Sequence, residues 1–256
     1  METRQQAQEL ISAGRVTVNG APAFKAARQV SGAEAVLVSG PPPRFVSRAG
    51  HKLEAALDTF AVDPDGRVGL DIGSSTGGFT DCLLQEGAQR VVAIDVGTNQ
   101  LHERLRSDDR VTSMENTHIR DVTMDTFAGD DAAPAAGFGI VVADLSFIST
   151  TGLLPHMAGF LAGDGDLLVL VKPQFEAGRA EVSKGRGIIR DAEIWKRVLH
   201  EFIDAAGPAG LEVEGLAISP VIGGKGNVEF LAHLRRAAIL GDVTSSTVAS
   251  ADRPGR

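Results

Sequence analysis

Short apolar runs alternate with amphipathic stretches along most of this chain of 256 residues. Near-continuous apolar runs favour buried strands, whereas apolar positions spaced three or four residues apart favour helices. On these patterns we predict five strands, at residues 68–72, 90–94, 111–114, 138–143 and 167–171. Helices are predicted at residues 79–84, 153–161 and 191–206. Strands that alternate with helices are typical of a doubly wound α/β sheet whose strands are mostly parallel.

The C-terminal part of the pattern predicts an antiparallel edge. Residues 211–219 and 227–234 read as two further strands joined by a glycine-rich turn, so we expect a hairpin that completes a seven-stranded sheet. Residues 178–187 contain three glycines and are predicted to form a mobile loop over the site. In the predicted helix 191–206, we expect one apolar stripe to face inward, formed by Ile194, Val198, Phe202 and Ile203.

The first 40 residues form a separate pattern. A short amphipathic helix ends at Gly14, an alternating strand at residues 15–20 closes in an Asn-Gly turn, and three prolines follow Gly40. A proline run is a stiff linker. We therefore predict a small α+β domain at 1–40, a linker at 41–47, the large domain at 48–238 and a disordered tail at 239–256 that is rich in Ser, Thr and Gly.

Composition and charge exclude some classes of protein. One cysteine excludes an internal disulfide, and no apolar run reaches the roughly 18 residues of a membrane span, so we expect a cytoplasmic protein with no membrane partner. The net charge of -8 weighs against a nucleic-acid partner. Yet residues 1–52 carry seven Lys and Arg against three acids, and residues 172–197 carry seven against four. A basic face on an acidic body therefore stays possible.

The segment that follows the first predicted strand is a candidate ligand site. Residues 73–78 are rich in glycine, which permits positive φ angles and close approach of a ligand to the backbone, and a helix N-terminus comes next. The spacing fits neither a dinucleotide fingerprint nor a triphosphate loop. Asp71 and Asp95 end neighbouring strands, and they suit an amino group and ribose hydroxyls, so we predict S-adenosylmethionine as the ligand. The alternative is that both acids only cap loops.

Two polar residues end the next two predicted strands. Asp144 follows the run at 138–143, and Lys172 follows the run at 167–171. The carboxyl ends of parallel strands lie at one edge of a sheet, so we expect both side chains beside the glycine loop. Lys52 lies at the start of a predicted helix, where the helix dipole disfavours a cation. A cation at an unfavourable position indicates a functional role.

Five motifs in order resemble a known family. The segments SRAGHKL, DIGSSTGGFT, VADLSFIS, LVKPQFE and GNVEF are similar to those of the TlyA family of ribosomal-RNA 2'-O-ribose methyltransferases, within the FtsJ-like group, and its members are often labelled haemolysins. The resemblance covers about Arg4 to Arg236 and implies a Rossmann-like methyltransferase domain. It further implies methyl transfer from S-adenosylmethionine to cytidine ribose hydroxyls, with ribosomal RNA or ribosomal subunits as partners.

The N-terminal pattern resembles the S-four RNA-binding domain, whose usual first helix is absent from this sequence. We expect either a true start upstream of Met1 or a truncated copy of that domain. Such a domain presents Arg and Lys side chains to RNA phosphates. The residues that we predict to bind RNA are Arg4, Arg15, Lys25, Arg44, Arg48 and Arg186.

The resemblance also assigns the site. FtsJ-like enzymes carry a Lys-Asp-Lys-Glu tetrad, and by motif its catalytic residues fall on Lys52, Asp144, Lys172 and Glu229. Lys172 would orient or deprotonate the ribose hydroxyl, and the two acids would hold the lysines. The predicted cofactor-binding residues are Asp71, Gly73, Ser75, Thr76, Gly77, Gly78, Phe79, Asp95, His118 and Asp144. His118 stands where the family usually has Asn. No metal is required, and we expect a monomer or a weak dimer.

Three other functions stay open at this point. The chain could be a non-catalytic RNA-binding or ribosome-assembly factor that keeps a cofactor pocket. It could damage membranes, as the haemolysin label suggests. It could also be a nicotinamide dehydrogenase, although the spacing of the glycine loop disfavours this.

Overall fold

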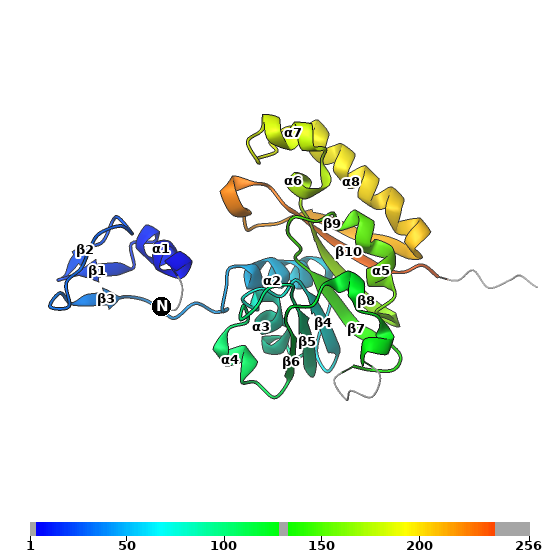
Figure 1. Ribbon diagram of the computed structural model, residues 1–256, viewed down its shortest axis with the longest axis horizontal. Coiled ribbons are helices and arrows are strands. Elements are labelled where there is room, and N and C mark those ends of the chain that lie inside the picture. The colour runs from blue at the N-terminus through cyan, green and yellow to red at the C-terminus, as the bar shows by residue number, and fades with distance from the viewer. Residues whose placement is uncertain (1–3, 128–132, 239–256) are drawn as a thin grey trace, which may run out of the picture.

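The computed structural model describes residues 4–127 and 133–238 and contains a seven-stranded sheet (Figure 1). The strand order is β6-β5-β4-β7-β8-β10-β9. All pairs from β6 to β8 are parallel, whereas β10 is antiparallel to both β8 and β9, so the predicted edge hairpin is confirmed. The strands are β4 Val68–Ile72, β5 Arg90–Ile94, β6 Val111–Met114, β7 Phe138–Ala143, β8 Leu161–Val171, β9 Leu211–Ile218 and β10 Phe230–Arg236.

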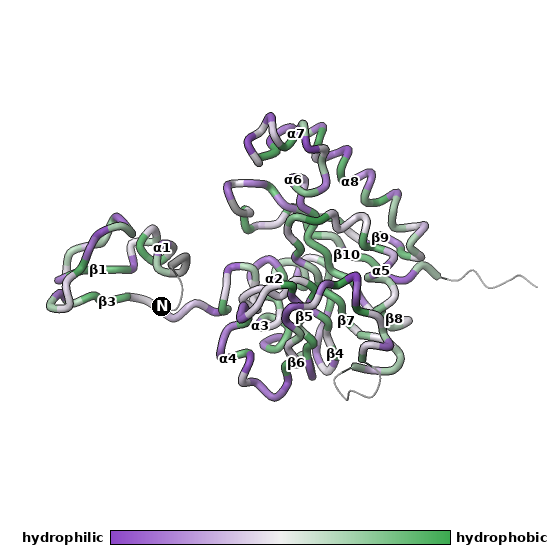
Figure 2. Tube along the Cα trace, viewed as in Figure 1, coloured by the Kyte–Doolittle hydropathy of each residue, from purple (hydrophilic) through white to green (hydrophobic). Residues whose placement is uncertain are grey.

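Helices cover both faces of this sheet. One face packs against α2 (Ala49–Phe60) and α3 (Gly78–Gln85), and the other packs against α5 (Leu154–Ala158) and α8 (Ala192–Ala206) (Figure 1). Neighbouring strand residues therefore belong to opposite cores, and the central strands are buried on both sides. Burial on two faces explains why these strands read as continuous apolar runs (Figure 2).

The remaining helices of the large domain are short. They are α4 Glu103–Arg106, α6 Pro173–Glu176 and α7 Arg179–Lys184. Single 3-10 turns lie at Ile119–Asp121, Met124–Phe127, Thr151–Leu153, Gly207–Ala209 and Gly224–Gly226. No helix within the described residues is long and apolar enough to cross a membrane.

Four predicted elements were wrong in part. The helix predicted to run to residue 161 ends at Ala158, because β8 begins at Leu161 and continues through a register shift that Gly165 permits. A Cβ at Gly165 would lie 2.8 Å from the carbonyl oxygen of Phe138. The segment 178–187, predicted as a loop, contains α7, because Gly178 and Gly185 cap that helix at its two ends.

The other two differences concern the last helix and the last strand. Ile203, predicted to face inward, is 39% exposed, whereas its neighbour Phe202 is fully buried. The strand predicted from residue 227 begins at Phe230. The Asn227 carbonyl accepts from the Gly223 N–H at 2.9 Å, so its main chain belongs to the turn, and its side chain bonds to the Ile189 N–H and the Gly187 carbonyl.

The N-terminal residues form a small unit that lies apart from the large sheet (Figure 1). It contains α1 (Arg4–Ser12), β1 (Val16–Val18), β2 (Ala21–Pro22) and β3 (Val36–Val38), with β1 in the centre. Its core is formed by Leu10, Val16, Val18 and Ala23. The predicted boundaries at 40, 47 and 238 stay predictions, and the predicted tail lies outside the described residues.

Candidate active site

A cavity of about 580 Å³ opens at the carboxyl edge of β4, β5 and β7. Five of the residues predicted to bind a cofactor line it, namely Gly73, Ser75, Asp95, His118 and Asp144. A smaller cavity of about 160 Å³ adjoins it and adds Phe79. Parallel strands deliver these side chains to one edge of the sheet, as expected.

The glycine loop owes part of its composition to packing within the protein. Gly77 has a φ of +96°, and a Cβ there would lie 2.3 Å from a methyl group of Leu105. A Cβ at Gly78 would lie 2.3 Å from Ser47 Oγ. Thr76, Gly77 and Gly78 line neither of these two cavities. Their backbone is therefore approached by other parts of this chain, and their predicted contact with a cofactor stays a prediction.

Asp71 is fully buried and ties β4 to α3. Its Oδ2 accepts hydrogen bonds from the Thr80 N–H at 3.0 Å and from Thr80 Oγ1 at 2.6 Å. Its Oδ1 is buried with no hydrogen-bond partner among the described residues. Burial raises the pKa of this carboxyl to about 7. The predicted contact with a ligand amino group stays a prediction, because Asp71 does not line the cavity.

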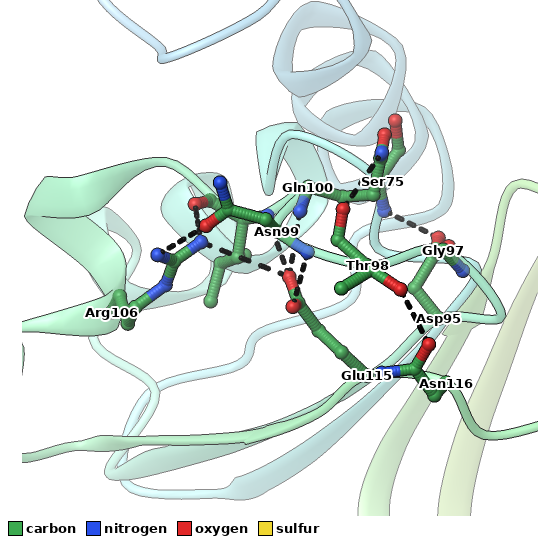
Figure 3. Close-up of polar contacts among 10 residues, drawn as sticks. Ser75, Asp95, Gly97, Thr98, Asn99, Gln100, Arg106, Glu115 and Asn116 are labelled. Atoms are coloured by element: carbon green, nitrogen blue, oxygen red, sulfur yellow. Dashed lines mark hydrogen bonds and ion pairs between the residues drawn. The ribbon is translucent and has the colours of Figure 1, made fainter.

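Asp95 joins two loops at the cavity wall (Figure 3). Its Oδ2 accepts from the Ser75 N–H at 2.8 Å, and its Oδ1 accepts from the Gly97 N–H at 2.7 Å. Each carboxylate oxygen keeps a further lone pair for a ligand hydroxyl. His118 lies on the same wall, where its Nδ1 accepts a hydrogen bond from the Arg120 N–H.

The four residues of the predicted tetrad meet in one chain of ion pairs. Glu229 Oε2 lies 2.6 Å from Lys52 Nζ, which lies 3.6 Å from Asp144 Oδ2, and Asp144 Oδ1 lies 2.5 Å from Lys172 Nζ. Both lysines and Glu229 are buried. Two cations thus face two carboxylates, and the formal charges of the group cancel. Pairing of this kind is what permits charged groups to be buried.

Two residues that the sequence did not single out bond to the group, and a third, Phe147, lines the cavities beside it. Lys172 Nζ donates to Ser146 Oγ at 3.1 Å, and Gln174 Nε2 donates to Glu229 Oε1 at 3.2 Å. Phe147 is 92% exposed with a φ of +66°, a left-handed conformation that costs free energy in a non-glycine residue. All three lie inside the motifs VADLSFIS and LVKPQFE, which are the signal that could have found them.

A larger cavity of about 880 Å³ lies on the other side of the tetrad. Lys52, Lys172 and Glu229 form part of its wall, and Ser146 lines this cavity as well as the two smaller ones. The cavities are therefore neighbours, with the tetrad between them. Three cations also line the large cavity, namely Arg179, Arg186 and Lys225.

The six cations predicted to bind RNA differ in their surroundings. Arg15 donates to the carbonyls of Ser39 and Pro41, and Arg44 forms ion pairs with Glu54 and Glu86, so both are engaged within the protein. Lys25 and Arg48 are exposed, and Arg186 lines the large cavity. Arg4 begins α1, but its side chain lies outside the described part of the structure.

Residues 4–127 and 133–238 contain no cluster of three or more His, Cys, Asp or Glu side chains that could hold a metal.

Family models and known proteins match both parts of this chain. The family model described as FtsJ-like methyltransferase matches residues 45–236, and the model described as S4 domain matches residues 2–36. The chain is 44% identical over 234 residues to the 16S/23S rRNA (cytidine-2'-O)-methyltransferase TlyA of Mycobacterium tuberculosis, an alignment that covers 91% of this chain and 84% of that relative. It is 42% identical over 232 residues to Hemolysin A of Brachyspira hyodysenteriae, which covers 91% and 93% of the two chains.

A solved structure from Streptococcus thermophilus, provisionally named a hemolysin, is also similar. It superimposes with a TM-score of 0.75 and 42% sequence identity, and the match covers 93% of this chain and 84% of that chain.

Proposed function

Because this chain belongs to the TlyA family of FtsJ-like methyltransferases, we propose that it transfers a methyl group from S-adenosylmethionine to a ribose 2'-hydroxyl in ribosomal RNA. The name of the Mycobacterium tuberculosis relative supports cytidine as the nucleotide. The observation that carries the proposal is the ion-paired tetrad, which lies between a cavity of cofactor size and a larger cavity rimmed by cations.

The smaller pair of cavities suits the methyl donor. Asp95 offers carboxylate lone pairs for ribose hydroxyls, and His118 lies on the same wall for the adenosine. Gly73 adds no side chain to the wall. A Cβ there would lie 2.9 Å from a methyl group of Leu145, which lines the same cavity. Asp144 belongs to the tetrad and also lines this cavity, so its carboxylate is placed to face a cationic ligand. When bound, S-adenosylmethionine supplies a methyl group on a positively charged sulfur, which is a good leaving group.

The protein's contribution is to place and activate the ribose oxygen. Lys172 lies between Asp144 and Ser146, so its ammonium can donate to the 2'-oxygen and orient it, and the neighbouring Asp144 carboxylate can take up the proton that the hydroxyl loses. Lys52 and Glu229 hold Asp144 in place through the ion-pair chain. Since the donor needs no further activation, holding the oxygen in line with the methyl group supplies much of the rate.

The large cavity suits an RNA nucleotide. Arg179, Arg186 and Lys225 are exposed on its wall and can contact phosphates. The exposed ring of Phe147 lies 5.1 Å from that of Phe175, and such rings are platforms on which bases stack. Lys25 and Arg48 would extend the contact beyond the cavity. We further infer a cytoplasmic location, where ribosomal RNA is found, and a monomer or weak dimer.

The test is transfer of labelled methyl from S-adenosylmethionine to ribosomal RNA and to isolated subunits, followed by mapping of the modified ribose. We expect incorporation by the natural protein and a loss of at least about 100-fold in Lys172→Met. Lys196→Met changes an exposed lysine of α8 and should leave the rate unchanged. Binding of RNA without any incorporation would favour a non-catalytic assembly factor, and a wild-type rate in Lys172→Met would refute the mechanism.

A further inference from the structure

The cavity of about 580 Å³ that suits the methyl donor is called the donor cavity below. Glu115 lies beside it without lining it. Ile94 and Met114, the last residues of β5 and β6, are register partners, so the residues that follow them, Asp95 and Glu115, leave the sheet side by side. The Asp95 N–H donates to the Met114 carbonyl at 3.1 Å, which fixes this arrangement.

The carboxylate of Glu115 accepts three successive backbone N–H groups (Figure 3). Its Oε2 accepts from Asn99 at 2.5 Å, and its Oε1 accepts from Gln100 at 2.7 Å and from Leu101 at 3.1 Å. These hydrogen bonds, that of Leu101 most, lower the pKa of Glu115 below its ordinary value. Asn99 has a φ of +56°, a left-handed conformation that asparagine adopts more readily than most non-glycine residues.

Arg106 contacts the same residues, 99–101, of the turn that runs from 97 to 102. Its Nη1 donates to Asn99 Oδ1 at 2.7 Å, and its Nη2 donates to the Leu101 carbonyl at 2.8 Å. Its Nη2 also lies 3.8 Å from Glu115 Oε1. The turn is therefore held by one carboxylate and one guanidinium, which makes charge-assisted contacts the main constraint on its shape.

This turn connects the two walls of the donor cavity. At its start, the Gly97 N–H is bound by Asp95, whose other oxygen binds the Ser75 N–H of the glycine loop. At its end, the His102 N–H donates to the Thr76 carbonyl at 3.1 Å. Leu101 packs where Gly77 lacks a side chain, since a Cβ there would lie 2.7 Å from its methyl group. The shape of the turn thus determines the positions of Asp95 and the glycine loop.

We propose that Glu115 is a positioning residue for the methyl donor, and that it acts through the turn at 97–102 on Asp95 and the glycine loop. The inference rests on the proposed function. It concerns donor affinity and leaves the tetrad and the RNA cavity untouched.

The test is calorimetric titration of S-adenosylmethionine into Glu115→Gln, together with methyl-transfer kinetics. The amide keeps one acceptor oxygen and turns an NH2 group towards a backbone N–H, so at least one of the three hydrogen bonds is lost. We expect the donor Kd and the donor KM to rise at least tenfold. Both kcat at saturating donor and the KM for RNA should stay within twofold of the natural protein.

The matched control is Glu103→Gln, which changes an exposed glutamate in the first turn of α4 and should leave the donor Kd unchanged. Glu115→Asp keeps the charge but shortens the side chain, and an intermediate loss of affinity is expected; it decides the question if the amide variant does not fold. A donor Kd within twofold of the natural value would overturn the inference. So would an equal loss in kcat and RNA affinity, which indicates a general structural role. If the natural protein itself bound no donor, the proposed function would fail instead.

Discussion

Asp166 is expected to stabilise the large domain at the end of the sheet opposite the active site, where the parallel strand β7 begins. It pairs in register with Ile140 near the start of β7, and its side chain is fully buried. The carboxylate lies 2.5 Å from Arg67 Nη1, 2.6 Å from His233 Nε2 and 2.7 Å from Arg235 Nε. Asp166→Asn keeps the shape of the side chain but removes its charge and one acceptor oxygen, so all three contacts lose the negative charge and at least one of them loses its acceptor.

The magnitude follows from these contacts. A hydrogen bond to a charged group contributes about 1.5–3 kcal/mol. The side chains of Arg67 and Arg235 are 31% and 49% exposed, so solvent screens their share, whereas His233 is buried. We expect Asp166→Asn to lower the free energy of unfolding by about 3 kcal/mol. For a domain of this size that corresponds to a decrease in Tm of about 6–12 °C.

The effect should depend on pH in one direction. Burial alone would raise the pKa of Asp166, but the hydrogen bonds from His233, Arg235 and Arg67 together hold it below its ordinary value. A carboxyl whose folded-state pKa is lowered contributes stability that is present above its ordinary pKa and is lost as the pH falls through the folded-state pKa. The difference between the natural protein and Asp166→Asn should therefore be constant from pH 7 to about 4 and should shrink at lower pH.

Thermal and urea unfolding measure both effects, with Asp164→Asn as the control, because Asp164 lies two residues earlier on β8 and is exposed. Methyl transfer per folded molecule should be unchanged, since the cluster lies far along the strands from the tetrad. A loss of less than about 1 kcal/mol in Asp166→Asn would refute the assignment, and a difference that grew below pH 4 would show that its sign is wrong.

Three further predictions concern the site. Asp144→Asn leaves the two lysines with one carboxylate and should lower kcat by about 100- to 10,000-fold in the methyl-transfer assay with RNA binding retained, whereas Asp58→Asn on the exposed face of α2 should have no effect. Gly77→Ala forces a Cβ against two leucine side chains, so a lower Tm and weaker donor binding are expected; unchanged values in both would contradict the packing argument. Asp71 has a raised pKa of about 7, so its ionisation costs the folded state stability as the pH rises from about 4 to 7. The Tm of Asp71→Asn minus the Tm of the natural protein should therefore increase from pH 5 to pH 8. A decrease in this difference over that range would contradict the cause assigned to the shift.

The bounds of β4, β5 and β7 follow from sequence because each strand is buried on both faces and ends at a polar or glycine residue. The edge strand β6 is only partly buried, and its bounds follow from its short apolar pattern and the polar Glu115 after it. The start of β8 could not be predicted from sequence, because Gly163 and Gly165 are typical of a turn but lie within a strand that shifts register. The positions of Asp144 and Lys172 could be predicted from sequence because each residue directly follows the last residue of a buried strand. Those of Lys52 and Glu229 came from resemblance, since 177 residues separate them and no local pattern indicates that they meet.

Glu115 was not predicted, and the reason is physical. A carboxylate that accepts backbone N–H groups has partners that any residue can supply, so its partners leave no trace in the identities of residues 99–101. Long-range contacts to the main chain are in this sense invisible to pattern analysis.

The insertion of β10 between β8 and β9 has a consequence for biosynthesis. Glu229 immediately precedes β10, so a nascent polypeptide can enclose the donor cavity while the partner of Lys52 is still unmade. Until β10 has paired between β8 and β9, Asp144 is the carboxylate beside the Lys52 ammonium group. Methylation competence should consequently arise only after β10 has been made and has paired with β8 and β9.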